Sequence, residues 1–197
     1  MADRLSDAAL DQLFHAARTR NGWSDRPVDD ATIASIYETA KWGPTSSNSN
    51  PARFIWVRSP DAKERLAACA TGSNAAKIRA APVTVIIGRD MNFVERMDYL
   101  FPIKPEMAQM MRTIPGMLEG TAVRNTTLQG AYLMIAARAH GLDCGPMSGF
   151  DAKAVDAAFF AGTAVQTDFI CTIGYGTEEG LFPRLPRLPF DDANRIV

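Results

Sequence analysis

Three short apolar runs, spread far apart along the chain, limit the fold more than any other feature of the sequence. Residues 53–58, 83–88 and 169–175 have the β-branched and aromatic content of buried strands. Between them lie longer segments whose apolar residues recur at helical spacing. The strands do not alternate regularly with single helices, so the order predicts an α+β fold, with a few strands enclosed by helices, and not a Rossmann sheet.

Helices are predicted around these strands. A first helix is expected from Ser6 through Ala17, with Gly22 as its stop, and a second from Asp29 or Asp30 to the region of Gly43. Further helices are expected over 60–70, after residue 73, over 118–140 and over 151–160. Residues 43–51 and 141–150 are predicted loops. Residues 91–117 are irregular and could form either a mobile lid or two short packed helices.

Length and charge exclude several classes of protein. The chain has 197 residues, a formal net charge of -1 and 47% hydrophobic residues. A chain of this length can bury one sizeable core without disulfides or metals, so residues 1–197 are predicted to form one domain. Its near-neutral charge offers no sequence-wide basic footprint for nucleic acid.

The reactive side chains are few. The chain has two histidines and three scattered cysteines, with no Cys-x-x-Cys or His-x-x-x-His spacing, so no zinc site and no disulfide framework is predicted. The first residues show no signal peptide, and no apolar run is long enough to span a membrane. These features predict a cytoplasmic protein.

No motif for a catalytic side chain is found either. Gly-x-Gly-x-x-Gly, the P-loop motif and the Gly-x-Ser-x-Gly elbow are all absent. An enzyme built from this chain would therefore take its reactivity from a cofactor, and no side chain is expected to be a nucleophile. Such an enzyme is expected to act on a small-molecule substrate.

Two groups of polar residues suit a phosphorylated heteroaromatic cofactor. Arg18 and Arg20 near the first helix and Arg184 and Arg187 in the Pro-rich tail could converge on one phosphate through charge-assisted bonds. Asn74 and Lys77 lie three apart on a short helix and so share a face; an amide and an ammonium there could hold the edge of a heteroaromatic ring. The alternative for both groups is that they are ordinary polar side chains exposed to solvent.

Taken together, these segments resemble the flavin-dependent nitroreductase family. The matching motifs are Arg18-x-Arg20, the loop 44–51, Asn74-x-x-Lys77, the segment 141–151 and Arg187-Leu188-Pro189. They occur in the family's order and cover nearly the whole chain. Within the family, residues 17–23, 41–46, 125–129, 145–151 and 173–176 are most similar to the malonic semialdehyde reductase subgroup (3-hydroxypropanoate dehydrogenases) of the pyrimidine-utilisation (Rut) pathway.

The resemblance implies a nitroreductase-like fold, with a central, mainly antiparallel sheet enclosed by helices, and an intertwined homodimer that binds FMN at its interface. It also implies a cofactor-binding role for fourteen residues. Those at the ribityl phosphate and beside it would be Arg18, Thr19, Arg20, Arg184 and Arg187. Asn74 and Lys77 would lie at the pyrimidine edge of the flavin. The partner subunit would contribute Thr45, Ser46 and Asn48. One face of the flavin ring would be covered by Pro146, Met147, Ser148 and Gly149.

The implied activity is that of an FMN-dependent oxidoreductase with NADH or NADPH as reductant. A hydride would pass through flavin N5 in a ping-pong sequence, with malonic semialdehyde reduced to 3-hydroxypropanoate. A cation such as Lys77 would favour the anionic reduced flavin. The alternatives are a broad-specificity nitroreductase or quinone reductase, a flavin-binding module with little turnover, and a protein that keeps the fold without the flavin.

Three residues depart from the family pattern. Gly22 stands where the family often has Lys or Arg, Ser148 replaces an acidic residue, and Leu185 falls where a second basic phosphate ligand is common. These departures bear on the flavin potential and on the choice of acceptor. The sequence does not distinguish NADH from NADPH.

Overall fold

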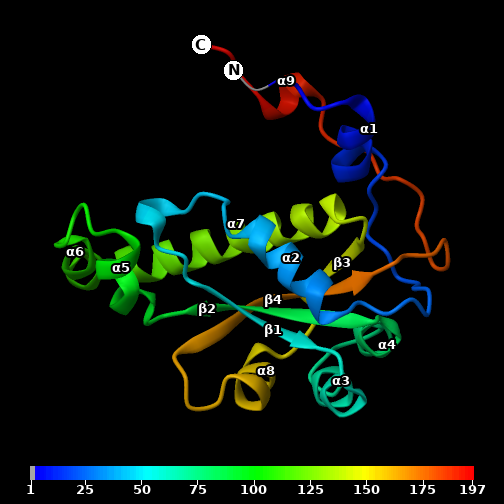
Figure 1. Cartoon of the computed structure of the whole chain (residues 1–197), viewed down its shortest axis with the longest axis horizontal. Coiled ribbons are helices and arrows are strands. Elements are labelled where there is room, and N and C mark those ends of the chain that lie inside the picture. Colours follow the sequence, from blue (N-terminus) through cyan, green and yellow to red (C-terminus); the bar gives the residue numbers. More distant parts are fainter. Residues whose placement is uncertain (1–2) are drawn as a thin grey trace.

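The computed structural model describes residues 3–197, and a four-stranded antiparallel sheet lies at its centre (Figure 1). From one edge to the other, the strands are β1 (Ala52–Val57), β2 (Val83–Asp90), β4 (Val165–Gly174) and β3 (Asp143–Met147). Every neighbouring pair is antiparallel, and helices cover both faces. The predicted α+β class and mainly antiparallel sheet are confirmed.

Strand β3 was not predicted, and the expectation of a loop over its residues was wrong. Its five residues include Gly145 and Pro146, which normally indicate a turn. β3 lies at the edge of the sheet and pairs with β4; on its other side only a single bridge, between Cys144 and Thr19, is found among the described residues. A proline is tolerated at such an edge because this side of the strand needs few N–H donors. β4 also begins earlier than predicted, because Val165 and Gln166 pair with the end of β2.

Helices lie in two groups, one on each face of the sheet (Figure 1). The first pair is α2 (Asp30–Ala40) and the long α7 (Met117–Ala139). The second group is α3 (Pro60–Ala67), α4 (Asn74–Ala80) and α8 (Ala152–Phe159). These five elements agree in kind with the predicted helices, and their ends differ by a few residues.

Strand β2 shows why the sheet has two cores. Val85 and Ile87 belong to the cluster shared with α2 and α7, whereas Ile86 belongs to the cluster shared with α3, α4 and α8. All three side chains are fully buried. A strand covered on both faces needs apolar residues at successive positions, which is the pattern that the sequence showed after Pro82.

The first predicted helix is shorter than expected. It consists of α1 (Asp7–Leu10), capped by Ser6, and a π-helical turn η1 (Asp11–His15). Gly22 was predicted to end this helix, but the helix ends earlier. Gly22 lies several residues further on, in a segment beside the C-terminal tail. The helix predicted from the apolar spacing is therefore confirmed only as far as His15.

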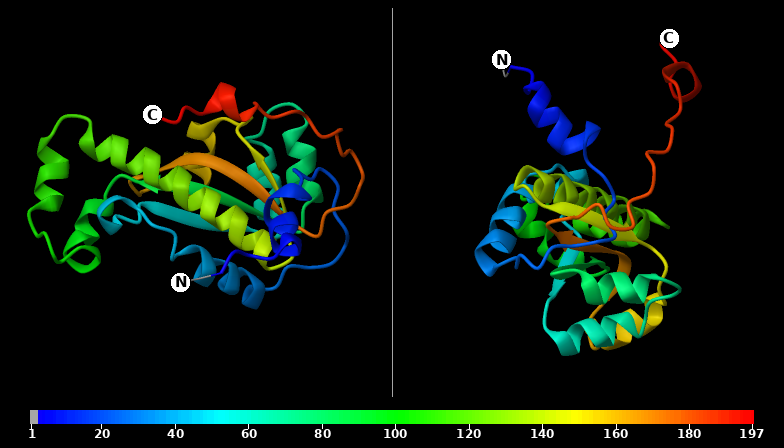
Figure 2. Two further views of the ribbon diagram at one scale, coloured as in Figure 1. Left: turned by 90° about the horizontal axis from the view of Figure 1, so that it is seen from above. Right: turned by 90° about the vertical axis from the view of Figure 1, so that its right-hand side faces the viewer.

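Residues 91–117 form short packed helices. The elements are η3 (Phe93–Arg96), α5 (Met97–Leu100) and α6 (Met107–Thr113). They pack on a separate core that includes Phe93, Met97 and Met111 and is completed by Ala122 of α7. This small unit projects beyond the end of the sheet at the N-terminal end of α7 (Figures 1 and 2).

Two arms rise from the opposite end of the molecule. One holds α1 and η1, and the other is the C-terminal tail with α9 (Phe190–Ala193). Figure 2 shows that they extend from the same side of the body but stay apart from each other. The tail exposes large apolar side chains, including Phe182 (71%) and Leu188 (72%). Within residues 3–197, no helix is both long enough and apolar enough to cross a membrane.

Candidate cofactor site

The start of the C-terminal tail runs beside residues 17–24 and is hydrogen-bonded to them. The N–H of Ser24 donates to the carbonyl of Tyr175 at 2.9 Å, and the N–H of Thr177 donates to the carbonyl of Gly22 at 3.0 Å. Further along, the amide of Asn21 donates to the carbonyl of Gly180 at 2.8 Å. This pairing brings two segments that are more than 150 residues apart to one place.

A cavity of about 660 Å³ lies where these segments meet the end of α7. Among residues 3–197, five cationic side chains line it and no carboxylate does. These cations are Arg18, Lys77, Arg138, Arg184 and Arg187. Thr19 also lines the cavity. Several guanidinium groups that meet without acidic partners suit a phosphate, which accepts bidentate, charge-assisted hydrogen bonds.

The arginines are held in place by backbone carbonyls. Arg18 donates to the carbonyl of Phe182, and Arg184 donates to the carbonyl of Ala17 at 3.1 Å, so each segment holds an arginine of the other. Arg138 donates to the carbonyl of Leu13 at 3.0 Å, and its Nε is buried without a hydrogen-bond partner among the described residues. A buried N–H of this kind is suited to an acceptor supplied by a ligand.

Helix α4 connects this cavity to the turn after β3. Lys77 lines the cavity, and Asn74, one turn earlier, donates to the carbonyl of Gly149 at 3.0 Å. A Cβ at Gly149 would lie 2.5 Å from the side-chain nitrogen of Asn74, so a larger residue there would push this amide aside. The turn and the cationic cavity therefore meet the same short helix at positions one turn apart.

The four residues at the end of β3 differ in exposure. Pro146 and Ser148 are exposed, whereas Met147 packs on the core under α3 and α8. The carbonyl of Ser148 accepts a hydrogen bond from the N–H of Phe150 at 3.1 Å, which closes the turn around Gly149. Of the predicted residues Pro146 to Gly149, Gly149 thus contacts Asn74, whereas Met147 packs on the core.

The predicted partner-facing residues lie elsewhere on the molecule. Thr45 precedes η2 (Ser46–Asn48), and the N–H of Ser46 donates to the side-chain oxygen of Asn125 on α7 at 2.8 Å. Arg138, which lines the cationic cavity, is 13 residues further along α7. At 1.5 Å per residue these two positions are about 20 Å apart. One subunit therefore does not bring its own loop 45–48 to its own cationic cavity.

Arg20 has protein partners of its own and does not line the cationic cavity. Its Nη1 donates to Glu178 at 2.8 Å and to the carbonyl of Thr177 at 3.0 Å, and its Nε lies 3.6 Å from Asp143. The hydrogen bond with Glu178 is the main cause of a raised Arg20 pKa. Of the two arginines in the N-terminal motif, only Arg18 is placed with the other predicted phosphate ligands.

The structure gives reasons for two of the three departures. A Cβ at Gly22 would lie 2.5 Å from Thr177 Oγ1 and 2.7 Å from Glu179 Cβ, so the tail leaves no room for a Lys or Arg there. Leu185 lines the cavity, and its neighbour Arg184 lines it as well and supplies a cation. Nothing in the structure explains Ser148.

Some residues of the site were missed in the sequence. Arg138 was overlooked because a basic residue in the last turn of a helix normally interacts with the helix dipole. Asn125 and Gln129 were quoted only as part of a motif. Their spacing of four residues on a largely apolar helix indicated a shared buried face, and both prove to be buried. The described residues contain no group of three or more side chains placed to hold a metal ion.

Comparison with known proteins identifies close relatives. The family model described as the nitroreductase family matches residues 17–176. Proteins named "Putative NADH dehydrogenase/NAD(P)H nitroreductase" from Caulobacter sp. (strain K31) and Stenotrophomonas maltophilia (strain R551-3) are 56% and 54% identical to this chain. The first alignment covers 98% of this chain and 99% of the relative, and the second covers 100% of both.

The same fold is found among solved structures. A protein from Exiguobacterium sibiricum 255-15, described as a "putative nitroreductase in complex with FMN", superposes with a TM-score of 0.87. The superposition covers 100% of both chains at 20% sequence identity. At this identity, the likeness concerns the fold.

Proposed function

Because the chain belongs to the nitroreductase family, we propose that it is an FMN-dependent NAD(P)H oxidoreductase whose FMN phosphate binds in the cationic cavity. The observation that supports this most directly is the lining of that cavity, in which the described residues supply five cations, no carboxylate and no partner for the Nε of Arg138. Such a lining is costly without an anion, because like charges repel when they are partly removed from water. The residues present fit a phosphate.

The neighbouring residues fit the rest of the cofactor. Arg18, Arg184 and Arg187 would hold the phosphate, with Arg138 beside them. Asn74 and Lys77 would face the polar edge of the ring, and the turn at Gly149 would lie against one ring face. When bound, FMN would supply the two-electron carrier, accepting a hydride from NAD(P)H and passing it to an acceptor. The protein would bind and orient the reactants and exclude water.

We propose further that the working form is a homodimer. The separation of about 20 Å between the loop 45–48 and the cationic cavity along α7 is explained if each loop serves the cavity of the other subunit. The two projecting arms also expose apolar residues, such as Phe14, Phe182 and Leu188, that a second copy could cover. A closed two-fold dimer would use both features twice.

The acceptor that we propose is malonic semialdehyde, reduced to 3-hydroxypropanoate, on the basis of the subgroup motifs in the sequence. A broad nitroreductase or quinone reductase activity is the second candidate. It is favoured by the names of the relatives that are 56% and 54% identical over nearly the full length of the chain.

A single preparation of the full-length protein tests the proposal. It should show the flavin absorption bands, as purified or after FMN is added, and should oxidise NADH or NADPH when malonic semialdehyde or a nitroaromatic compound is present. A protein that binds no FMN would refute the proposed function. Turnover with a nitroaromatic compound but not with malonic semialdehyde would refute the proposed acceptor alone. Sedimentation of an FMN-bound monomer would refute the shared site.

A further inference from the structure

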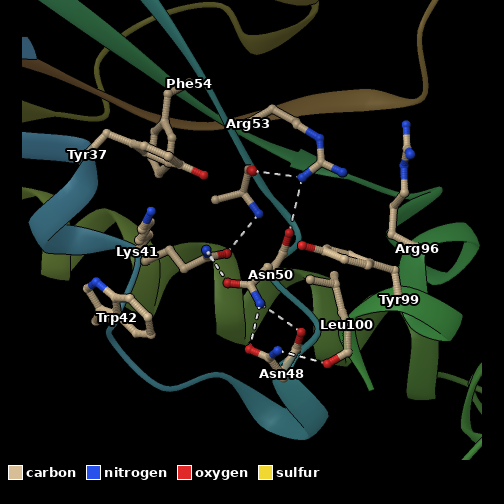
Figure 3. A pocket seen from close by; sticks show the side chains of 12 residues that line it. Tyr37, Lys41, Trp42, Asn48, Asn50, Arg53, Phe54, Arg96, Tyr99 and Leu100 are labelled. Atoms are coloured by element: carbon tan, nitrogen blue, oxygen red, sulfur yellow. Dashed lines mark hydrogen bonds between the residues drawn. The ribbon is translucent and has the colours of Figure 1, made fainter. Parts of the chain in front are cut away.

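A second cavity lies at the other end of the molecule, beside the loop 45–51. Its volume is 540 Å³, which lies within the range of sites for small organic ligands. The lining comes from the end of α2, from the loop, from the start of β1 and from the η3–α5 unit. No predicted residue except Asn48 belongs to it. Figure 3 shows its side chains.

The walls of this cavity are aromatic. Tyr37 and Phe54 meet edge to face with ring centroids 6.2 Å apart, and Trp42 and Tyr99 are 81% and 85% exposed. In Figure 3 the rings of Tyr37 and Tyr99 come from opposite sides of the cavity. Exposed aromatic rings that gather around a hollow are typical of a binding surface, because a flat ligand can stack on them at little cost in side-chain entropy.

The amide side chains of the loop are already used to shape the floor of the cavity. Asn48 donates to the carbonyl of Leu100 at 2.8 Å, and Asn50 donates to the backbone and side-chain oxygens of Asn48 at 2.7 and 2.8 Å. Both asparagines have left-handed backbones, with φ of 47° and 42°. Such conformations cost free energy and are found mainly where the surrounding structure enforces them for function.

Three cations line the cavity, and two of them have carboxylate partners. Lys41 pairs with Glu38 of α2, and Arg53 pairs with Asp90 at 2.6 Å. Arg96 pairs with no carboxylate in the part of the chain that the structure describes. Its sequence neighbours Glu95 and Asp98 are exposed and do not line the cavity. The cavity therefore carries about one uncompensated positive charge, which suits a monoanion better than a phosphate dianion.

We propose that this cavity binds the electron acceptor, and that Arg96 selects acceptors that carry a single carboxylate. The assignment to the acceptor rests on the proposed function, since the cavity shares Asn48 with the loop proposed to approach the flavin of the other subunit. Arg96 supplies the charge-assisted hydrogen bonds and the aromatic rings cover the body of the acceptor. Malonic semialdehyde is a small monocarboxylate of this charge, whereas an unsubstituted quinone is not.

The test compares two nitro acceptors of similar shape, 4-nitrobenzoate and 4-nitrobenzyl alcohol, with the FMN-loaded full-length protein. The quantity measured is the ratio of kcat/KM for the acid to kcat/KM for the alcohol. Differences in intrinsic reactivity cancel when this ratio is compared between variants. Arg96→Gln should lower the ratio about tenfold or more, the usual effect of losing a hydrogen bond to a charged group. Arg96→Lys should keep most of it.

Arg112→Gln is the matched control. Arg112 is an exposed arginine on α6 of the same small unit, and it does not line the cavity. Its loss should leave the ratio unchanged. If Arg96→Gln turns over both acceptors with the wild-type ratio, or if Arg112→Gln lowers the ratio as much as Arg96→Gln does, the inference is wrong while the proposed oxidoreductase function stands.

A binding measurement separates this inference from the proposed function. Titration of the purified protein with 4-nitrobenzoate should quench the fluorescence of Trp42 with saturation, and Trp42→Phe gives the contribution of the two other tryptophans. The dissociation constant should rise about tenfold in Arg96→Gln. Saturable, Arg96-dependent quenching in a protein that binds no FMN would support the carboxylate site and refute the oxidoreductase. Quenching that is linear, or independent of Arg96, would refute the carboxylate site.

Discussion

The side-chain oxygen of Asn125 accepts a hydrogen bond from the backbone N–H of Ser46 at 2.8 Å, across 79 residues of sequence. One turn later on α7, Gln129 accepts from the N–H of Ala52 at 2.9 Å and donates to the side chain of Asn50 at 3.2 Å. Both amides are buried. Between these two anchor points the loop contains three left-handed residues other than glycine: Ser47, Asn48 and Asn50. Helix α7 therefore fixes the ends of a strained loop.

Asn125→Leu should destabilise the protein and loosen this loop. Leucine has a similar volume but removes the acceptor of the Ser46 N–H; because Ser46 itself is exposed, the loss should cost about 0.5–1.5 kcal/mol, the usual net value of one hydrogen bond. Urea unfolding should show a lower midpoint with an unchanged slope. FMN should also bind more weakly if the loop contacts it. Arg124→Gln, an exposed neighbour on the same helix, is the control. An Asn125→Leu variant with the wild-type midpoint would show that the bond does not stabilise the loop.

Arg18→Ala should weaken FMN binding. Arg18 lines the cationic cavity, and the loss of a charge-assisted bond to phosphate typically reduces affinity by about tenfold or more. Fluorescence titration with FMN measures the effect. Arg195→Ala removes an exposed arginine near the end of the same tail and should leave the affinity unchanged. Equal FMN affinity in Arg18→Ala and wild type would remove Arg18 from the phosphate site.

Gly149→Ala should disturb the contact between Asn74 and the turn after β3. The new Cβ would lie 2.5 Å from the side-chain nitrogen of Asn74, and the bond from Asn74 to the Gly149 carbonyl would be displaced. Because the amide of Asn74 can move aside, the cost in the free energy of unfolding should lie at the low end for overpacking, about 1 kcal/mol. The affinity for FMN should fall with it. Thermal and urea unfolding, together with FMN titration, give both quantities.

Gly120→Ala is the matched glycine control, and its expected effect has the opposite sign. No atom lies within 4 Å of a Cβ at Gly120, which is within α7, and alanine is favoured over glycine in a helix by about 0.5–1 kcal/mol. If Gly149→Ala were as stable as Gly120→Ala, the close approach at Gly149 would not constrain the site.

Local sequence patterns predicted the elements that bury a regular apolar face. The run after Pro82 became the central strand β2, and the spacing in residues 118–140 became α7. Strand β3 was missed because its pairing with β4, which supplies the hydrogen bonds, is not encoded in its own five residues. In general, partners that are distant in sequence decide the structure of short segments rich in glycine and proline.

In the candidate site, too, local motifs predicted some residues, whereas contacts between distant segments decide the others. Arg18 and Arg187 could be singled out from motifs, and the structure does bring them to one cavity. The different place of Arg20 could not be foreseen, because Glu178 and Asp143 reach it only when the tail runs beside residues 17–24. The cavity around Arg96 was also beyond local patterns, since it is assembled from α2, the loop, β1 and the η3–α5 unit.

Stability should decrease at acid pH because two carboxyl groups have lowered pKa values in the folded state. The pKa of Asp29 is lowered mainly by its hydrogen bonds with Thr32 at the start of α2, and the pKa of Glu64 mainly by its hydrogen bond with Arg79. A lowered folded-state pKa stabilises the fold above the unfolded-state pKa. This contribution is lost as the pH falls through the folded-state value.

The urea midpoint should therefore fall as the pH is lowered below about 5, where unfolded Asp and Glu begin to bind protons. The double variant Asp29→Asn and Glu64→Gln should show a flatter profile in this range, since neither new side chain titrates. Asparagine is also a good N-cap, so helix α2 should still form. A double variant with the wild-type pH profile would assign the acid sensitivity to other carboxyl groups.

Arg20 should act as an anchor for the tail and not as a phosphate ligand, and Glu178→Gln distinguishes the two roles by the sign of its effect. Glu178 accepts the shortest hydrogen bond from Arg20, at 2.8 Å. If Arg20 only anchors the tail, Glu178→Gln weakens that contact, loosens the segment that carries Arg184 and Arg187, and makes FMN binding equal or weaker. Limited proteolysis of the tail should become faster. If Glu178 and the phosphate instead compete for Arg20, removal of the carboxylate frees the guanidinium of Arg20, and FMN should bind more tightly. Because the side chain of Glu178 is 82% exposed, the change in affinity in either direction should be modest, and the direction is the result that decides.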